Sequence, residues 1–368
     1  MKTVVSLLKN ETVLVLSLAL AVISMFFVPP DRAYPGYIDF RTLALLFCLM
    51  VVMAGLNRLG LFRRLAGSLL SRLKTLRGLS LTLCLLCFFS AMAVTNDVAL
   101  ITFVPFSVVA LRFAGRMDSL VSLVTLETVA ANLGSMLTPV GNPQNLYLFS
   151  AYGMQAVEFF QAVLPYGAFS LVLTTAAALL MGGDRLESRR EQDPEPLDRK
   201  RGAAYGILFA MALCTVFRLI PWGVTLAVTL AVVLLLDRKC LYGVDYSLLL
   251  TFVFLFVFIG NLGRIPPVSS FLEQVVTGRE VIAGILASQV FSNVPAAILL
   301  SGFTDNAADL LVGVNLGGLG TLIASMASLI SYKFVVKGNA SSGRYLLVFT
   351  VVNLVFLGAN LCLWLFIR

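Results

Sequence analysis

The chain has 368 residues, of which 59% are hydrophobic and only 12% are charged, and its formal net charge is +8. Soluble domains carry about 45–50% apolar and about 25% charged residues, so this composition excludes an ordinary soluble enzyme. The sequence contains no histidine, which also excludes His-ligated metal sites, Ser-His and Cys-His catalysis, and a histidine proton relay.

Apolar segments follow one another along the whole chain, and about 20 apolar residues are enough to cross the hydrocarbon core of a bilayer. The sequence therefore predicts an all-α polytopic membrane protein. The predicted membrane segments are 12–29, 41–57, 79–111, 119–147, 160–181, 203–220, 222–236, 246–262, 281–303, 308–331 and 345–366.

Two of these segments, 79–111 and 281–303, have lengths that suit neither one crossing nor two. Each has polar residues near its middle: Thr-Asn-Asp at 95–97 and Ser-Asn-Val-Pro at 292–295. We expect re-entrant hairpins that return to their own side, because non-helical backbone at this depth is tolerated only inside protein or along a cavity. The alternative is two full crossings joined by a surface turn, for which the uncharged stretch 98–111 is short.

The basic residues support the hairpin interpretation. With both hairpins re-entrant and the N-terminus inside, 21 of the 27 Lys and Arg residues fall on the cytoplasmic side, as the positive-inside rule requires. The arrangement has about nine full crossings and places the C-terminus outside. The positive charge is therefore a topology signal, and we expect no nucleic-acid partner.

The two halves of the chain repeat the same order of elements. Ala-Asn-Leu-Gly-Ser at 131–135 follows the first tip, and Val-Asn-Leu-Gly-Gly at 314–318 follows the second. Each lies in an apolar helix that is then interrupted, at 141–145 in the first half and near 324–328 in the second. We expect an inverted-topology repeat, in which the binding site lies near the midplane where the broken elements meet. The predicted organisation is a first repeat over 1–181 (tip 95–97, broken helix 119–147), a cytoplasmic linker over 182–202, a connecting helix over 203–220, and a second repeat over 221–368 (tip 292–295, broken helix 308–331).

Asp97 is the residue that points most directly to ion transport. A carboxylate at membrane depth costs about 2.5–3.5 kcal/mol on insertion scales and marks an ion path by default. The alternative is that Asp97 caps the following half-helix. In either case Thr95 and Asn96 place polar groups at a half-helix N-terminus, where the partial positive charge suits an anion.

The Gly-Asn-Pro-Gln-Asn segment explains the first helix break. Pro143 lacks a backbone N–H and Gly141 permits an unwound backbone. The freed carbonyls, with the side-chain oxygens of Asn142 and Asn145, suit a hard cation such as sodium. The alternative is a plain proline kink.

Three further residues have two readings each. Glu127 precedes the first broken helix and is either a second titratable group in the pathway or a carboxylate at the cytoplasmic boundary. Asn132 and Asn315 occupy the same place in the repeat, and either belong to the site or donate hydrogen bonds between helices.

The two tips, the segment 132–145 and the segment around Asn315 together resemble the ion transporter superfamily. It includes divalent-anion/sodium symporters, citrate transporters, arsenite permeases and a sodium/proton antiporter branch. The chain most resembles small bacterial inner-membrane permeases with a citrate-transporter-like domain, over nearly its whole length. The resemblance implies a homodimer in which each protomer has a scaffold and a transport domain and works by elevator-like alternating access.

The resemblance also implies roles for individual residues. In the dicarboxylate branch each tip is Ser-Asn-Thr, so Asn96 and Asn293 match its central asparagine. Gly141 and the 324–325 region match the loops that complete two sodium sites. Asp97 and Val294 stand where that branch has threonine, so two carboxylate-binding hydroxyls are missing and Asp97 would repel a dicarboxylate. An Asn-Asp tip is more similar to the arsenite-permease and antiporter side.

We therefore expect a secondary active transporter of a small organic or inorganic anion, coupled to sodium or protons, and not an enzyme. The alternatives are a cation/proton antiporter with Asp97 as proton carrier and, less favoured, an ion channel. Without histidine, an intramembrane hydrolase would need a paired-Asp or a Ser-Lys centre, and the sequence indicates no second carboxylate opposite Asp97. We expect no cofactor besides the coupling Na+ or H+, and a lipid-embedded homodimer in a bacterial inner membrane.

The residues expected to bind substrate or ion are Thr95, Asn96, Asp97, Asn132, Gly141, Asn142, Pro143, Asn145, Ser292, Asn293, Val294, Asn315, Ala324 and Ser325. Sodium is expected at Asn96, Gly141, Asn293 and Ala324, and proton coupling at Asp97 or Glu127.

Overall fold

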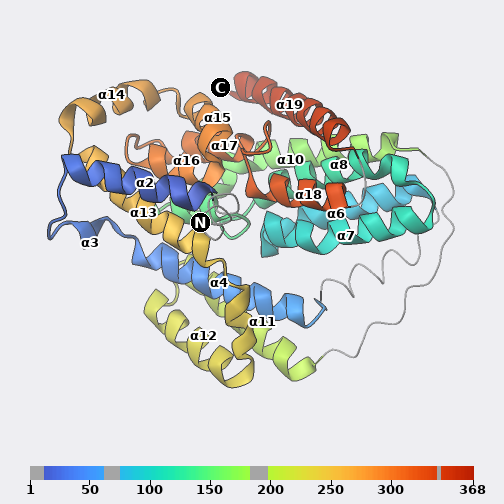
Figure 1. Cartoon of the computed structure of the whole chain (residues 1–368), viewed down its shortest axis with the longest axis horizontal. Coiled ribbons are helices and arrows are strands. Elements are labelled where there is room, and N and C mark those ends of the chain that lie inside the picture. The colour runs from blue at the N-terminus through green and yellow to red at the C-terminus, as the bar shows by residue number, and fades with distance from the viewer. Residues whose placement is uncertain (1–11, 62–74, 183–197, 338–340) are drawn as a thin grey trace, which may run out of the picture.

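The computed structural model describes residues 12–61, 75–182, 198–337 and 341–368, and their regular elements are all helices (Figure 1). Five of the described helices, α4, α6, α10, α13 and α19, are long and apolar enough to cross a membrane. Both findings confirm the prediction of an all-α polytopic membrane protein. The predicted inside position of the N-terminus and most of the predicted linker fall on 1–11 and 183–197, outside the described residues.

The elements in chain order are α2 (Thr12–Phe27), α3 (Tyr34–Tyr37), α4 (Phe40–Arg58), α6 (Leu76–Val94), α7 (Asn96–Phe113), η1 (Met117–Ser119), α8 (Leu120–Ser135), α9 (Pro143–Ala151), α10 (Ala156–Leu180), α11 (Arg199–Val216), α12 (Trp222–Leu236), η2 (Arg238–Gly243), α13 (Tyr246–Gly263), α14 (Pro266–Val276), α15 (Glu280–Phe291), α16 (Asn293–Ser301), α17 (Ala307–Leu316), α18 (Met326–Lys337) and α19 (Ser342–Ile367).

Both predicted hairpins consist of two helical arms that pack together. In the first, α6 ends at Val94 and α7 begins at Asn96, so Thr95 alone forms the tip. In the second, Ser292 alone separates α15 from α16.

Both long helices that follow the hairpins are broken, but each break begins earlier than the sequence indicates. The first covers residues 136–142, because Pro143 takes the opening position of α9. Its missing N–H costs nothing at that position, so it starts a helix instead of interrupting one. The second break covers 317–325 and begins at Gly317 and Gly318; Gly320 in the same loop has φ +112. The predicted connecting helix is α11, four residues earlier in the chain than expected at its start.

The two halves exchange their second half-helices. The second-half helix α18 packs against α7 and α8 of the first half (Figure 1), and the first-half helix α9 packs against α16 of the second. Helices α6–α10 and α15–α19 therefore form one interlocked unit, which we call the hairpin body.

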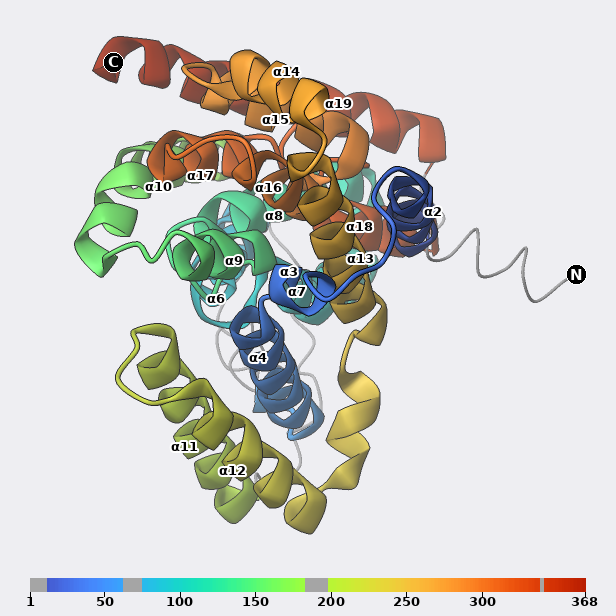
Figure 2. The same cartoon turned by 90° about the vertical axis from the view of Figure 1, so that its left-hand side faces the viewer.

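The helices α2, α4, α11, α12 and α13, with the short η2, surround this body, and we call them the flanking helices. Figure 2 shows α4, α11 and α12 grouped at one end of the molecule, away from α15 and α19. A small hydrophobic core holds this group together, formed mainly by residues of α4, α11, α12 and η2 such as Val51, Tyr205, Val233 and Cys240. A larger core fills the hairpin body and extends into the flanking helices, through residues such as Leu49 of α4, Ala212 of α11 and Phe252 of α13.

The flanking helices α4 and α13 occupy the same place in the two halves and run in opposite directions. Gly243, just before α13, lies against Ala54 near the end of α4, where an added Cβ would come within 2.6 Å of the alanine methyl. Gly260, near the end of α13, lies under the ring of Tyr37, just before α4. The start of each helix thus meets the end of the other, as an inverted repeat requires.

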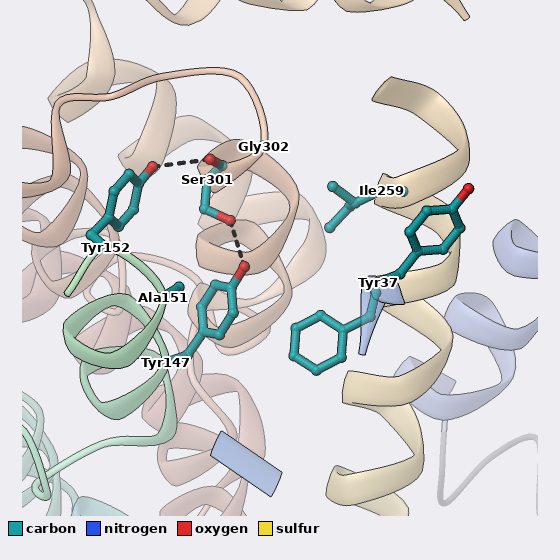
Figure 3. Close-up of a pocket in the computed structure, with 9 residues that line it drawn as sticks. Tyr37, Tyr147, Ala151, Tyr152, Ile259, Ser301 and Gly302 are labelled. Atoms are coloured by element: carbon teal, nitrogen blue, oxygen red, sulfur yellow. Dashed lines mark hydrogen bonds between the residues drawn. The ribbon is translucent and has the colours of Figure 1, made fainter. Parts of the chain in front are cut away.

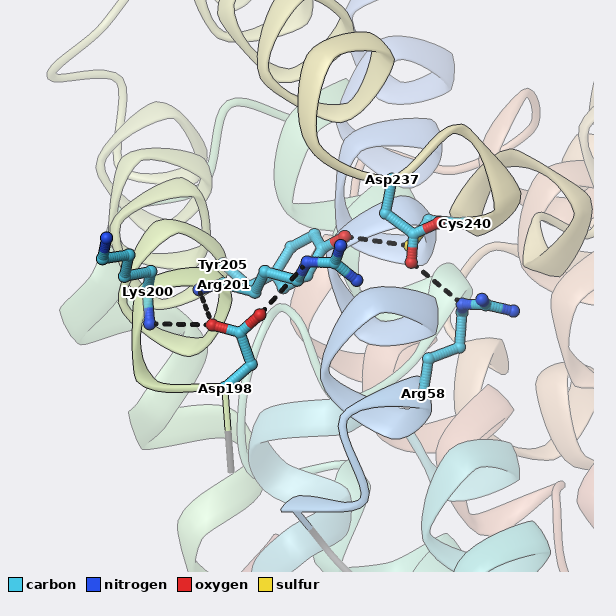
Figure 4. Close-up of polar contacts among 7 residues, drawn as sticks. All are labelled: Arg58, Asp198, Lys200, Arg201, Tyr205, Asp237 and Cys240. Carbon is cyan, nitrogen blue, oxygen red and sulfur yellow. Dashed lines mark hydrogen bonds and ion pairs between the residues drawn. The ribbon is translucent and has the colours of Figure 1, made fainter. Parts of the chain in front are cut away.

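Two ion pairs follow the same relation. Arg58, the last residue of α4, binds Asp237 before α13 at 3.1 Å (Figure 4). Arg264, which follows α13, binds Asp31 before α4 at 2.7 Å. One constant offset in residue number relates Asp31 to Asp237 and Arg58 to Arg264. Each pair therefore joins one half of the chain to the other.

Candidate functional site

Both hairpin tips have the same strained backbone. Thr95 has φ 77 and ψ 153, and Ser292 has φ 72 and ψ 155. This region is otherwise almost reserved for glycine, and holding another residue in it costs of order 1–3 kcal/mol. Such strain persists only where the surrounding structure holds it in place, and it concentrates at functional sites. The two tips are therefore candidates for one composite site.

Asn132 joins the first tip to both broken helices. Its Oδ1 accepts a hydrogen bond from the Asn96 amide at 2.9 Å and another from the Ser325 hydroxyl at 3.1 Å. Its own amide donates to the carbonyl of Gly318 at 3.5 Å. Asn132 therefore connects tip one, α8 and the loop of the second half.

Asn315 makes the corresponding connection from the second half. Its Oδ1 accepts from the Asn142 amide at 3.1 Å, and its own amide donates to Asn145 Oδ1 at 2.7 Å and to the carbonyl of Leu311 at 2.8 Å. Both repeated asparagines thus hydrogen-bond across the two halves, at the points where the helices break.

An amide side chain holds each loop in shape. In the first loop, Asn145 donates to the carbonyls of Ser135, Met136 and Thr138 at 3.2, 3.2 and 3.0 Å. Three of the carbonyls that the break frees therefore already accept a hydrogen bond. Gly141 is required in this loop because an added Cβ would lie 2.1 Å from the carbonyl oxygen of Ser135.

In the second loop Gln289 has this role, which sequence reasoning missed. Its amide donates to the carbonyls of Gly317 and Leu319 at 2.8 and 3.0 Å, and its Oε1 accepts from the Thr321 N–H at 2.9 Å. The signal that could have identified it is a lone amide inside an apolar hairpin arm, three residues before the tip.

The second tip is tied to the second loop. The carbonyl of Ala324 accepts from the Asn293 N–H at 3.0 Å and from the Ser292 hydroxyl at 3.4 Å. Ser292 and Val294 line only a cleft of about 30 Å³. Tip two is therefore closed in this conformation.

The first tip faces a cavity of about 490 Å³ between the hairpin body and the flanking helices. Thr95, Asp97, Asn142 and Pro143 line it from the hairpin body. Arg58, Lys239 and Asp245 line it from α4, η2 and the start of α13. Arg58 and Lys239 are among the 21 basic residues predicted to lie on the cytoplasmic side, so the cavity lies on that side of the predicted topology.

Two residues that line this cavity each have a buried oxygen with no hydrogen-bond donor among the described residues: Asp97 through its Oδ1 and Asn142 through its Oδ1. Asn142 is only 2% exposed. Buried polar atoms are nearly always hydrogen-bonded, so each exception needs an explanation. Two such acceptors at one cavity suit a ligand that brings positive charge or a donated proton.

The structure corrects one expectation about carboxylates. The sequence indicates no second carboxylate opposite Asp97, but Asp245 lines the same cavity from the flanking helices. Asp245 stands directly before an apolar run, so in the sequence it has only the appearance of a helix cap.

Glu127 lies inside the hairpin body, fully buried, and does not line this cavity. The hydroxyl of Ser107 on α7 donates to its Oε1, and its Oε2 has no partner in the part of the chain that the structure describes. It is therefore not an exposed carboxylate at the boundary, and its part in transport stays a prediction.

Residues 3–328 match the family described as citrate transporter. An uncharacterized transporter of Methanocaldococcus jannaschii is 34% identical over 324 residues, which are 87% of this chain and 88% of that protein. The inner membrane protein YbiR of Escherichia coli is 31% identical over 84% of this chain and 83% of its own length. A silicon efflux transporter of Oryza sativa subsp. japonica is 33% identical over 40% of this chain and 30% of its own.

Proposed function

The chain belongs to the citrate transporter family, and from this premise we propose that it is a secondary active transporter that couples a small anion to sodium or protons. The observation that carries the coupling is the pair of donorless acceptors, Asp97 Oδ1 and Asn142 Oδ1, at one cavity. A carboxylate and an amide carbonyl are the oxygen ligands that hard cations prefer. A proton on Asp97 would serve the same purpose.

The same geometry gives a physical reason for coupling. The half-helices α7 and α16 begin at Asn96 and Asn293, and helix N-termini attract anions. The charge of Asp97 opposes an anion there until a cation or proton neutralises it. Anion binding is then strong only after cation binding, which is the energetic content of symport.

The anion itself belongs to a broad class. The family is described by citrate, and the rice relative is named for silicon efflux, so organic and inorganic substrates both fall within the proposal. The lack of hydroxyls at Asp97 and Val294 argues against a dicarboxylate, because two groups that would bind its carboxylates are missing.

We further propose that the hairpin body moves against the flanking helices, as the resemblance implies, within a homodimer in a bacterial inner membrane. The small core formed mainly by α4, α11, α12 and η2 supports this only as far as it holds those helices to one another, since the larger core also includes residues of α4, α11 and α13. The Escherichia coli relative supports the location.

The thermal stability of purified protein tests the cation site directly. We would measure the melting temperature in sodium and in choline chloride from pH 5.5 to 8.5, for wild type, Asp97→Asn and Asp198→Asn. Asp198 is the matched control: it caps α11 through the N–H groups of Lys200 and Arg201 (Figure 4) and does not line the cavity.

A ligand at 100 times its dissociation constant adds about 2.7 kcal/mol of stability. In wild type and Asp198→Asn, the melting temperature should be higher in sodium than in choline chloride if sodium binds, or should depend on pH if a proton binds. Asp97→Asn should lose this dependence. Wild-type protein that responds to neither ion would overturn the proposal.

Cation/proton antiport is the second candidate, and Asp245 favours it, since two carboxylates make the cavity better suited to cations than to anions. Proteoliposomes separate the two. Symport requires an anion for sodium or proton flux, whereas antiport exchanges sodium for protons with no added anion.

A further inference from the structure

Asp245 is the one carboxylate that the flanking helices place at the candidate site, within the described residues that line the cavity. Its Oδ1 accepts from the Leu248 N–H at 2.9 Å and so caps α13. Its other oxygen accepts no hydrogen bond from the described residues, and the residue is exposed to the cavity. The cap therefore uses only half of this carboxylate.

The charges around the cavity leave Asp245 available for a cation. The titratable residues that line it are Arg58 on α4, Asp97 at tip one, Lys239 and Tyr242 on η2, and Asp245. Arg58 is already paired with Asp237 at 3.1 Å. Loop one and α18 contribute no charged residue to the lining. Two carboxylates therefore face a single unpaired lysine.

Asn142 provides independent support for a ligand site at this cavity, which its side chain helps to line. Its amide is engaged by Asn315, and its buried Oδ1 has no donor among the described residues. A carboxylate pair alone would be only a local concentration of negative charge. Together with the unpartnered carbonyl oxygen of Asn142, the two carboxylates form an incomplete set of oxygen ligands for a hard cation.

The corresponding aspartate in the first half of the chain caps its helix with both carboxylate oxygens engaged. Asp39 is the counterpart of Asp245, capping α4 through the Thr42 N–H at 3.0 Å. The hydroxyl of Thr42 occupies the second oxygen of Asp39, whereas the corresponding position after Asp245 is Leu248. Asp39 is thus fully satisfied, and Asp245 is not.

The cavity near Tyr37, at the opposite end of the molecule, holds no tip residue. It measures about 220 Å³ and lies between α13 and the end of hairpin two (Figure 3). There Tyr147 shares a hydrogen bond with the Ser301 hydroxyl at 2.7 Å, and Tyr152 donates to the Ser301 and Thr304 carbonyls at 3.0 and 2.7 Å. These hydrogen bonds close the end of the molecule near Tyr37. The candidate site therefore opens toward Asp245 and not toward Asp39.

We propose that Asp245 shares a sodium ion with Asp97 and Asn142 while the site lies beside η2, and so sets the sodium affinity on the cytoplasmic side alone. The inference rests on the proposed function, in which the hairpin body carries the cation past fixed flanking helices. Because Asp245 belongs to the flanking helices, it loses the ion when Asp97 moves away. Asp245 therefore binds the ion at one position of the hairpin body and does not move with it.

Side-specific sodium exchange tests this assignment. We would measure ²²Na⁺ equilibrium exchange in inside-out and right-side-out membrane vesicles, and obtain the half-saturating sodium concentration on each face. The variants are Asp245→Asn, Asp97→Asn and, as matched control, Asp39→Asn. Asparagine caps helices as well as aspartate does, so Asp245→Asn removes the charge and keeps α13 capped.

Asp245→Asn should raise the half-saturating sodium concentration about tenfold on the cytoplasmic face and leave the outer face unchanged, whereas Asp39→Asn should leave the cytoplasmic face unchanged. Restoring the charge with Asp245→Glu should recover part of the affinity. If Asp97→Asn abolishes exchange but Asp245→Asn matches wild type, this inference is wrong and the proposed function stands. An equal loss on both faces also overturns it, because Asp245 would then belong to the carrier. Wild-type vesicles without sodium exchange overturn the inference together with sodium coupling, while proton coupling keeps its own test in the pH dependence of stability.

Discussion

The two hairpin tips have the same backbone conformation but different surroundings. Thr95 and Ser292 have nearly identical dihedral angles, and an asparagine follows each. The first tip then presents Asp97 to a cavity of about 490 Å³. The second presents Val294 to a cleft of about 30 Å³, and its backbone is bound to Ala324.

This difference shows that the repeat conserves geometry while the chemistry has diverged between the halves. The strained tip, the asparagine crosslink and an amide-held loop are present in both halves. Of the two tips and loops, only the first tip and loop carry a charge and buried acceptors without a donor among the described residues, at Asp97 and Asn142; the second half contributes Asp245 from its flanking helix instead. A symmetric frame thus holds an asymmetric site.

The largest expected loss of stability is for an alanine substitution at the helix contact of the first half, compared with the same substitution in the second half. An added Cβ at Gly134 would lie 2.1 Å from the carbonyl oxygen of Phe88, so Gly134→Ala must force α6 and α8 apart. At the corresponding Gly317 the nearest atoms are Oγ and Cβ of Ser288, at 2.6 and 2.8 Å, and the carbonyl oxygen of Gly313, at 2.9 Å, so the overlap is smaller than at Gly134. Overpacking costs typically 1–3 kcal/mol and occasionally more, so we expect about 3 kcal/mol or loss of folding for Gly134→Ala and about 1–2 kcal/mol for Gly317→Ala.

Thermal unfolding in detergent measures both variants. Gly206→Ala is the control, since nothing lies within 4 Å of its added Cβ and alanine favours the helix by up to about 1 kcal/mol. Equal losses at Gly134 and Gly317 would show that the halves are packed alike.

A smaller effect should separate the two loops by function. Asn145→Ala and Gln289→Ala each release loop carbonyls, and each should cost about 1–3 kcal/mol. Only Asn145 holds the loop that carries Asn142 to the cavity, so only Asn145→Ala should also weaken stabilisation by sodium. If Gln289→Ala weakened it equally, the second loop would belong to the ion site.

The smallest effect concerns the two ion pairs and pH. Burial alone would raise the pKa of Asp237, but hydrogen bonds from Arg58 and from the Lys239 N–H outweigh it and hold this pKa below its usual value. Hydrogen bonds from Arg264 and the Ala33 N–H likewise lower the pKa of Asp31. A lowered carboxylate pKa contributes stability above the unfolded value, about 3.9, and this stability is lost as pH falls through the folded pKa.

Arg58→Gln and Arg264→Gln should therefore be less stable than wild type at neutral pH, with the difference shrinking below about pH 4. Asp237 is 13% exposed and Asp31 42%, so water screens the second pair more and Arg58→Gln should have the larger effect. Melting temperatures between pH 3 and 7 would measure both, and a difference that grows on acidification would contradict the assigned direction.

The sequence contains enough information to predict the hairpins, their tips and the paired asparagines, because polar residues inside apolar runs are locally visible. The exact breaks were not predictable in the same way. Pro143 can kink a helix or begin one, and only the packing of α9 against α16 decides between these outcomes. The partnership of Asp245 with Asp97 is also invisible, because a capping aspartate has the same local pattern wherever it faces. Gln289 was missed for a related reason, since its partners lie in a loop whose position depends on the tertiary fold.

The exchanged ion pairs also affect how the chain is made. Arg58 and its partner Asp237 are 179 residues apart, and ribosomes add about 5–20 residues per second. The completed α4 therefore waits roughly ten to forty seconds for the aspartate that neutralises its last residue. The Arg58–Asp237 pair forms only after the first half, α11 and α12 have all been synthesised, so this link between the halves is made late.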